Sequence, residues 1–177
     1  RNEQLQLAPM VEEIFTDLTS LAEKRSITLE AEGDAALTGS DALIYRMLFN
    51  LTENAVKYNR PGGSVRVELA QGQEKCIIRV SDTGCGIPEE YQRSIFHPFF
   101  RVDKSRSREY GGAGLGLSLV WEIADLHGGS VWVEESSDKG TTIAVELPAG
   151  AEKTAQAMAS RCFCPPDRVD GCASLYS

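Results

Sequence analysis

Apolar residues in the first third of the chain recur first with helical and then with strand spacing. Between Pro9 and Lys24 they return every three or four residues, and because proline fits the first turn of a helix, an amphipathic helix is predicted there. Residues Ile27 to Glu32 alternate as a half-buried strand does. Ser40 is suited to cap a second helix. The apolar stripe of this second helix consists of Leu43, Met47, Leu51 and either Ala55 or Val56.

The remainder of the patterned chain predicts strands, further helices and a final strand pair. Turn residues Asn59 to Gly63 follow the second helix, and the double glycine after His127 stops the last helix. The predicted elements are strands over Val65 to Ala70 and Cys76 to Val80, a short helix after Pro88, a helix over Leu115 to Leu126, and strands over Val131 to Glu135 and Thr141 to Leu147.

Composition and charge exclude several classes of protein. The formal net charge of -8 argues against a nucleic-acid binder, which needs clustered Lys and Arg. No apolar run is long enough to cross a bilayer and no signal peptide is evident, so this segment is expected to be cytoplasmic and without membrane contact. One domain is expected over residues 1–148, followed by a poorly ordered tail over residues 149–177 that has no pattern able to bury a face.

The run GGAGLGL is the first candidate for chemistry. Its glycines at Gly112, Gly114 and Gly116 leave backbone N–H groups open to a polyphosphate at the start of a helix. The run matches neither the Rossmann fingerprint nor the P-loop, which needs Gly-Lys-Ser/Thr. Taken alone, it favours a surface loop that caps a helix. The charged segment Arg101 to Gly112 before it is typical of a lid.

A second candidate is a polar line on the second predicted helix. Asn50, Asn54 and Lys57 stand at i, i+4 and i+7, which places two amides and an ammonium along one helical face. Such a face suits a metal ion and phosphate oxygens. The alternative is an ordinary solvated face.

Two further segments complete the set. Asp82 ends an apolar strand and is followed by Gly84 and Gly86, which would let a flat ligand approach the backbone; the alternative is a tight turn. Residues Ile95 to Arg101 form an aromatic cluster that ends in an arginine, and the alternative there is a lid hinge packed into the core.

In order and content these four segments resemble the ATP-binding catalytic domain of bacterial sensor histidine kinases. That family shares the GHKL (Bergerat-fold) superfamily with the type II topoisomerase, mismatch-repair and heat-shock chaperone ATPases. The resemblance covers Leu5 to Pro148 and implies an α+β fold, an α/β sandwich in which a mixed, mainly antiparallel sheet of about five strands packs on one layer of three helices, with a flexible ATP lid. The matching motifs are NLTENAVKY (N box), DTGCGIP (first glycine box), FHPFFR (F box), GGAGLGL (second glycine box) and the closing strand KGTTIAVELP.

The resemblance implies a role for each matching residue. Asp82 corresponds to the acid that accepts a hydrogen bond from the adenine amine, and since guanine presents an acceptor there, ATP is expected to bind more tightly than GTP by about one to two orders of magnitude. Asn54 corresponds to the magnesium ligand, with Asn50 as its companion, and Tyr58 to the ring beside adenine. The implied phosphate-contacting cations are Lys57, Arg101, Lys104 and Arg106, and the other implied nucleotide contacts are Gly84, Gly86, Ile87, Gly112, Gly114, Leu115, Gly116 and Thr141.

Asn50 bears on the type of reaction. The hydrolysing branches of the superfamily carry a glutamate base at this position, whereas an amide does not accept a proton at neutral pH. The resemblance therefore implies an enzyme that uses ATP and Mg²⁺ to phosphorylate a histidine on a separate domain, with Lys57 and Arg101 as catalytic residues. Glu53 either assists the transfer or is an exposed helix residue. The alternatives are a regulatory pseudo-kinase that only binds nucleotide, and a hydrolysing ATPase or chaperone of the same superfamily.

The acceptor histidine is expected outside this chain, because structural roles are preferred for both His97 and His127. The implied partners are the dimerisation and histidine-phosphotransfer domain of the same parent kinase and a response regulator. The isolated domain is expected to be monomeric and the parent kinase to be a homodimer. An anchor of the parent protein in the bacterial inner membrane is compatible with the resemblance.

Overall fold

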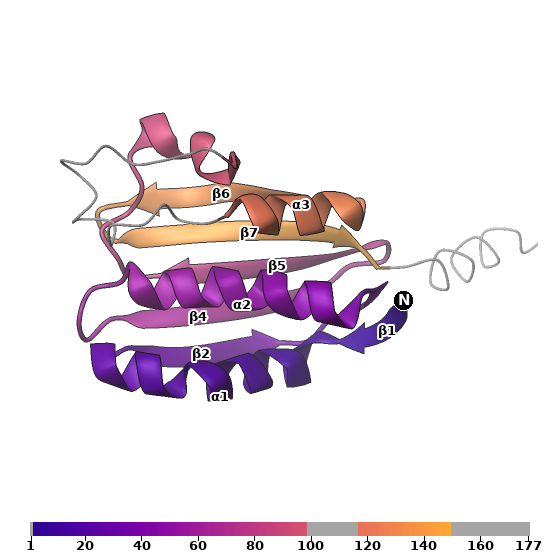
Figure 1. Cartoon of the computed structure of the whole chain (residues 1–177), viewed down its shortest axis with the longest axis horizontal. Helices are drawn as coiled ribbons and strands as arrows, with labels where there is room; N and C mark the ends of the chain where they lie inside the picture. Colours follow the sequence, from indigo (N-terminus) through magenta and orange to yellow (C-terminus); the bar gives the residue numbers. More distant parts are fainter. Residues whose placement is uncertain (1, 99–116, 150–177) are drawn as a thin grey trace, which may run out of the picture.

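Helices lie side by side on one face of a sheet (Figure 1). The structure, a computed structural model, describes residues 2–98 and 117–149. Its helices are α1 (Leu7–Arg25), α2 (Asp41–Lys57) and α3 (Ser118–Leu126), with the short 3-10 segments η1 (Glu89–Tyr91) and η2 (Ser94–Phe96). Its strands are β1 (Glu3–Gln6), β2 (Thr28–Gly33), β3 (Ala36–Gly39), β4 (Ser64–Gln71), β5 (Lys75–Asp82), β6 (Ser130–Ser137) and β7 (Gly140–Pro148).

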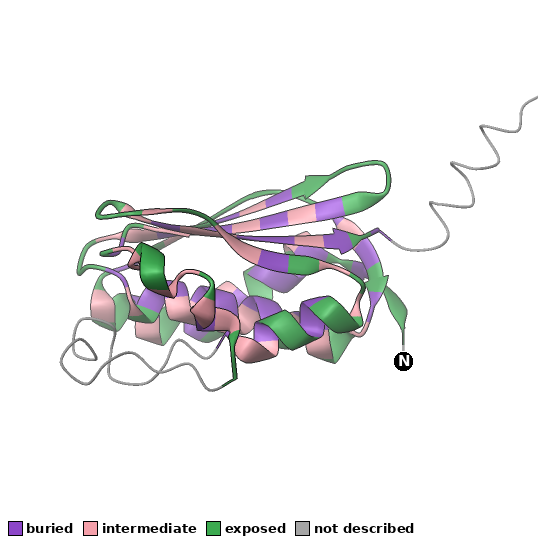
Figure 2. Cartoon of the chain, turned by 90° about the horizontal axis from the view of Figure 1, so that it is seen from above, coloured by how far each residue is buried: buried purple, intermediate pink, exposed green. Residues whose placement is uncertain are grey.

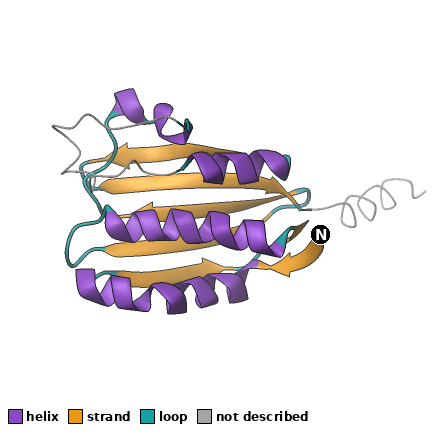
Figure 3. Ribbon diagram, viewed as in Figure 1, coloured by secondary structure: helices purple, strands orange, loops and turns teal. Residues whose placement is uncertain are grey.

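The main sheet has the strand order β2-β4-β5-β7-β6 (Figure 3). β2 pairs with β4 in parallel, and the other neighbouring strands pair antiparallel. This arrangement confirms the prediction of a mixed, mainly antiparallel sheet packed on a layer of helices. A separate two-stranded antiparallel sheet, formed by β1 and β3, is an addition that the sequence did not predict.

One face of the sheet is covered by the helices and is apolar. Along β5 the side chains of Cys76, Ile78 and Val80 are buried in the core, as expected of the apolar strand that Asp82 ends. Figure 2 shows the buried residues concentrated between the sheet and the helical layer. Because side chains alternate between the two faces of a strand, the residues between these three point away from the helices.

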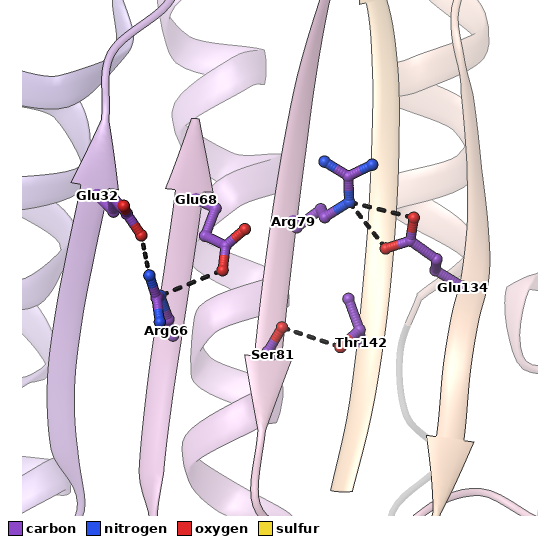
Figure 4. A network of polar contacts seen from close by, with 7 residues as sticks. All are labelled: Glu32, Arg66, Glu68, Arg79, Ser81, Glu134 and Thr142. Carbon is purple, nitrogen blue, oxygen red and sulfur yellow. Dashed lines mark hydrogen bonds and ion pairs between the residues drawn. The ribbon is translucent and has the colours of Figure 1, made fainter. Parts of the chain in front are cut away.

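The opposite face of the sheet is polar and carries ion pairs (Figure 4). Arg66 pairs with Glu32 and places its Nε 3.1 Å from Glu68, and the Nε of Arg79 lies 2.8 Å from Glu134. These side chains are solvent-exposed or half-exposed, so each pair is expected to contribute less than about 1 kcal/mol. The core therefore lies on the helical side.

Two helices begin at residues that differ from those predicted by the spacing of apolar residues. α1 begins at Leu7 instead of Pro9, because proline is also tolerated deeper in the first turn, where backbone N–H groups have no partner within the helix. The N–H of Ala8 is satisfied from outside, by Asp34 Oδ1 at 3.1 Å. α3 begins at Ser118, and the two residues predicted to start it, Leu115 and Gly116, lie outside the described residues.

A histidine ties the end of α3 to the beginning of α2. Nδ1 of His127 lies 2.8 Å from the carbonyl oxygen of Ile123, and its Nε2 accepts the N–H of Ser40 at 3.2 Å. The Ser40 hydroxyl in turn accepts the N–H of Leu43 at 3.4 Å, so it caps α2 as predicted. Both ring nitrogens are thus used in packing, which agrees with the structural role expected for His127.

The described residues end one position after β7. Ala149 is buried, and its N–H donates to the carbonyl of Glu74 at 2.9 Å. The rest of the expected tail, residues 150–177, lies outside the described part of the chain. No helix within the described ranges combines the length and the apolar character that a membrane crossing requires.

Candidate functional site

A pocket opens between α2, the loop after β5 and the beginning of β7. These segments are far apart in sequence and are brought together by the strand order, in which β5 and β7 are neighbours. The lining residues are Leu51, Asn54, Ala55 and Tyr58 from α2 and its C-terminal end, Val80, Asp82, Cys85, Gly86 and Ile87 from β5 and the following loop, Leu117 before α3, and Thr141 and Ile143 from β7.

The pocket brings together part of the site predicted from the sequence. The predicted residues that line it are Asn54, Tyr58, Asp82, Gly86, Ile87 and Thr141. Those that do not line it are Asn50, Glu53, Lys57 and Gly84. Those outside the described residues are Arg101, Lys104, Arg106, Gly112, Gly114, Leu115 and Gly116.

Sequence reasoning missed the apolar lining of the pocket. Leu51 and Ala55 belong to the stripe that α2 turns toward the core, and Val80 belongs to the buried face of β5. Each was therefore recognised as a core residue only. Periodicity identifies the buried face of an element, but which end of that face opens to solvent depends on the neighbouring elements.

Asp82, the last residue of β5, is held through one carboxylate oxygen. Its Oδ1 accepts the N–H of Gly84 at 2.9 Å and the N–H of Thr141 at 3.2 Å. No other residue in the described ranges hydrogen-bonds to this carboxylate, and Asp82 lines the pocket. Thr141 was expected to contact the ligand, and what the structure shows is its backbone N–H bonded to the acid.

Burial raises the pKa of the Asp82 carboxyl, and the backbone hydrogen bonds from Gly84 and Thr141 offset part of that rise. A carboxylate that has lost solvent gains from a polar hydrogen delivered into its pocket, because the donor replaces part of the lost hydration. The site is therefore suited to a ligand with an N–H group.

The two glycines after Asp82 are required by close contacts within the protein itself. A Cβ at Gly84 would lie 2.4 Å from the carbonyl oxygen of Tyr58. Gly86 has φ +80, and a Cβ there would lie 2.0 Å from the carbonyl oxygen of Ser137. Glycine is therefore required at both positions because the loop packs between the end of α2 and the turn from β6 to β7. This requirement differs from the predicted one, which was the approach of a ligand to the backbone.

The polar line of α2 divides between the pocket and the surface. Asn54 lines the pocket, whereas the Nζ of Lys57 pairs with Glu53 Oε1 at 3.0 Å. The Lys57 side chain is about half exposed, so the ion pair is screened and weak. At the end of the helix, burial and then the charge of Glu53 raise the pKa of Tyr58, which keeps its phenol neutral.

The donor set fits a magnesium ion that is shared with a phosphate ligand. Across residues 2–98 and 117–149, no three His, Cys, Asp or Glu side chains form a group that could hold a metal. The amide of Asn54 lines the pocket, and that of Asn50, one turn earlier on α2, does not. Mg²⁺ accepts such a sparse protein set, because it keeps waters and takes further oxygens from phosphates.

Comparison with known proteins gives a consistent set of similarities. A family model described as "Histidine kinase-, DNA gyrase B-, and HSP90-like ATPase" matches residues 39–151. The chain is 36% identical over 145 residues to the sensor histidine kinase RppB of Synechocystis, which covers 80% of this chain and 32% of RppB. It is 41% identical over 107 residues to the sensor histidine kinase WalK of Bacillus subtilis, which covers 59% of this chain and 18% of WalK.

The solved structures that are similar include the nucleotide-free catalytic domain of the histidine kinase ThkA, with a TM-score of 0.75 and 26% identity. That match covers 85% of this chain and 99% of the ThkA domain. The chain therefore spans a third or less of the length of these two relatives, but it corresponds to nearly the whole of a domain solved separately.

The contact between Gly86 and Ser137 can be tested with a matched pair of glycines. Gly62 has nearly the same φ, +81, but a Cβ there would have no other atom within 4 Å. We expect Gly62→Ala to cost about 1 kcal/mol for the left-handed backbone and Gly86→Ala to cost more than about 3 kcal/mol. Urea unfolding of both variants measures the difference, and equal losses would contradict the proposed contact.

The raised pKa of Asp82 predicts a stability effect. The folded chain binds this proton more tightly than the unfolded chain, so ionisation of Asp82 lowers stability as the pH rises through its folded-state pKa. Asp82→Asn keeps an oxygen for Gly84 and Thr141 without the buried charge, and we expect it to raise the Tm of the ligand-free chain at about pH 7 but not below about pH 3.5. Thermal unfolding at both pH values is the measurement. A lower Tm at neutral pH would contradict this account of the carboxyl.

Proposed function

Because this chain belongs to the family of histidine kinase-, DNA gyrase B- and HSP90-like ATPases, and within it to the catalytic domains of sensor histidine kinases, we propose that it binds magnesium-ATP and transfers the γ-phosphoryl group to a histidine on a separate domain. In this reaction the bond from the γ-phosphorus to the β,γ-bridging oxygen breaks, a bond to an imidazole nitrogen forms, and ADP leaves. The transfer is the kinase step of two-component signalling.

The Oδ2 of Asp82, to which no residue in the described ranges hydrogen-bonds, carries the proposal. It lies in a pocket with apolar walls from Leu51, Val80 and Ile143, which suit the faces of a purine. The exocyclic amine of adenine would donate to Oδ2, whereas guanine would present an oxygen to the carboxylate. Since Oδ1 is already bonded to two backbone N–H groups, the carboxylate has no freedom to turn away from a mismatched base.

Residues of α2 would hold the phosphate end of the nucleotide. Asn54, with Asn50 behind it, would ligate magnesium together with phosphate oxygens, and the ion would supply charge neutralisation at the phosphates. Lys57, which is about half exposed, would exchange its partner Glu53 for a phosphate oxygen. Further contacts from Arg101, Lys104, Arg106 and the glycines of the GGAGLGL run are part of the proposal through their positions in the motifs.

The proposal favours transfer over hydrolysis because of Asn50. Activation of water needs a proton acceptor near the γ-phosphate, and an amide does not serve as one. Glu53, the nearest carboxylate on the same helix, is engaged with Lys57 and does not line the pocket. A pseudo-kinase that only binds nucleotide is the second candidate, and it differs from the first by failing to label a supplied acceptor domain.

The partners of this chain follow from the same proposal. The acceptor would be the dimerisation and phosphotransfer domain of the parent kinase, and a response regulator would receive the phosphoryl group afterwards. Neither nucleic acid nor membrane is among the proposed partners of this segment, and its proposed location is the cytoplasm. We propose a monomer for the isolated domain and a homodimer for the complete kinase.

Nucleotide binding is tested by calorimetry with ATP and GTP in the presence of magnesium. We expect ATP to bind more tightly than GTP, and Asp82→Asn to weaken ATP by about ten-fold or more, because a hydrogen bond to a charged group is lost. The control is Arg79→Gln, which removes a charge from the opposite face of the sheet and should leave both affinities unchanged. Binding of ATP that is insensitive to Asp82→Asn would refute the site.

Transfer is tested by incubating the chain with γ-labelled ATP, alone and with a separately purified dimerisation domain. We expect little ATP turnover and no stable label on this chain alone, but label on the histidine of the added domain. Removal of magnesium by a chelator should abolish the labelling. Phosphohistidine retained on this chain, or rapid release of inorganic phosphate, would contradict the division of roles.

A further inference from the structure

A closed ring of hydrogen bonds lies beside the Asp82 turn and is not part of the pocket lining. The side-chain Nδ2 of Asn59 donates to the carbonyl of Ser64 at 2.8 Å. The N–H of Ser64 donates to Thr83 Oγ1 at 2.9 Å, and the Thr83 hydroxyl donates to Asn59 Oδ1 at 2.9 Å. We call this the Asn59 ring, formed by Asn59, Ser64 and Thr83.

The ring has its buried end at Asn59 and its exposed end at Thr83, and the backbone is shaped to admit it. Asn59 is only 6% exposed, and its Oδ1 also accepts the N–H of Arg60 at 2.8 Å. Gly63 makes the space, since a Cβ there would lie 2.3 Å from Thr83 Oγ1 and 2.5 Å from Asn59 Oδ1. Loss of the Thr83 hydroxyl would remove one of the two hydrogen bonds that the buried Asn59 Oδ1 accepts, and such a loss at a buried polar group is costly.

The ring connects the two walls of the pocket. Asn59 directly follows Tyr58, which lines one wall, and Thr83 directly follows Asp82, which lines the other. Gly84 packs against the carbonyl of Tyr58, so the two walls also touch beyond the ring. The spacing between the end of α2 and the Asp82 carboxylate is therefore set by side chains that do not themselves face the ligand.

The far end of the same loop is fixed independently. The N–H of Ile87 donates to Ser136 Oγ at 2.8 Å, and this hydroxyl lies 2.8 Å from Thr141 Oγ1. Loss of the Asn59 ring would leave this second attachment intact. The loop would consequently shift at the Asp82 end without detaching from the sheet.

We propose that Asn59 and Thr83 are positioning residues that hold the Asp82 carboxylate at the place where it selects the base of the nucleotide. This rests on the proposed function, in which Asp82 accepts a hydrogen bond from adenine. The two residues touch no nucleotide and act through Asp82. They are thus expected to govern the preference for ATP over GTP more than the affinity for the triphosphate.

The test uses Thr83→Val, which keeps the shape of the side chain and removes both of its hydrogen bonds. Kd values for ATP, and for GTP by competition, are measured on the full chain with magnesium. We expect Thr83→Val to weaken ATP about ten-fold with little effect on GTP, and Thr83→Ser, which retains the hydroxyl, to behave as the unaltered chain. Asn59→Asp, which turns a carboxylate oxygen toward the Ser64 carbonyl, should resemble Thr83→Val.

A double-mutant cycle with Asp82→Asn separates positioning from general damage. If Thr83 acts through Asp82, Thr83→Val causes no further loss of ATP affinity in the Asp82→Asn background. Additive losses, or equal weakening of ATP and GTP, would overturn the proposal.

If Thr83→Val unfolds at the assay temperature, Gly63→Ala provides the same test by displacing the ring from the opposite side. Failure of the unaltered chain to bind ATP, or of Asp82→Asn to weaken it, would instead refute the proposed function.

Discussion

The two hydrogen bonds that Gly84 and Thr141 donate to one oxygen of Asp82 are the interaction on which the site depends. They connect the end of β5, the loop after it and the beginning of β7 at a single atom. They compensate enough of the desolvation to keep a buried carboxyl in the pocket, yet burial still raises its pKa. A hydrogen-bond donor delivered into the pocket would therefore stabilise this carboxylate.

This interaction depends in turn on the register of the sheet. β5 and β7 are antiparallel neighbours in which Ser81 pairs with Thr142, and this places Thr141 next to Asp82. Gly140 has φ +142, and a Cβ there would lie 1.9 Å from the carbonyl oxygen of Asp82, so the turn before β7 closes directly over the end of β5. A slip of one residue in this pairing would send alternate side chains to the wrong face and remove the Thr141 N–H from the carboxylate.

Local patterns predicted those parts of the fold that neighbouring residues determine. The stripe of α2, its cap at Ser40 and the alternation of β5 all follow from spacing and residue type. The pairing of β1 with β3 did not follow, because strands of four residues are too short for a clear alternation and their pairing spans thirty or more positions. The Asn59 ring was missed for the same reason, since Thr83 is separated from Asn59 by 24 residues.

The pocket combines an apolar lining that belongs to the core with a polar rim that does not. Leu51 and Val80 are nearly fully buried and support the sheet as well as the pocket, so their truncation would lower stability together with binding. The rim is different, because the carboxylate of Asp82 is placed by backbone N–H groups and by the ring behind it. Changes of base preference without loss of the fold should therefore arise at the rim and in the Asn59 ring, where polar groups determine geometry while contributing little apolar burial.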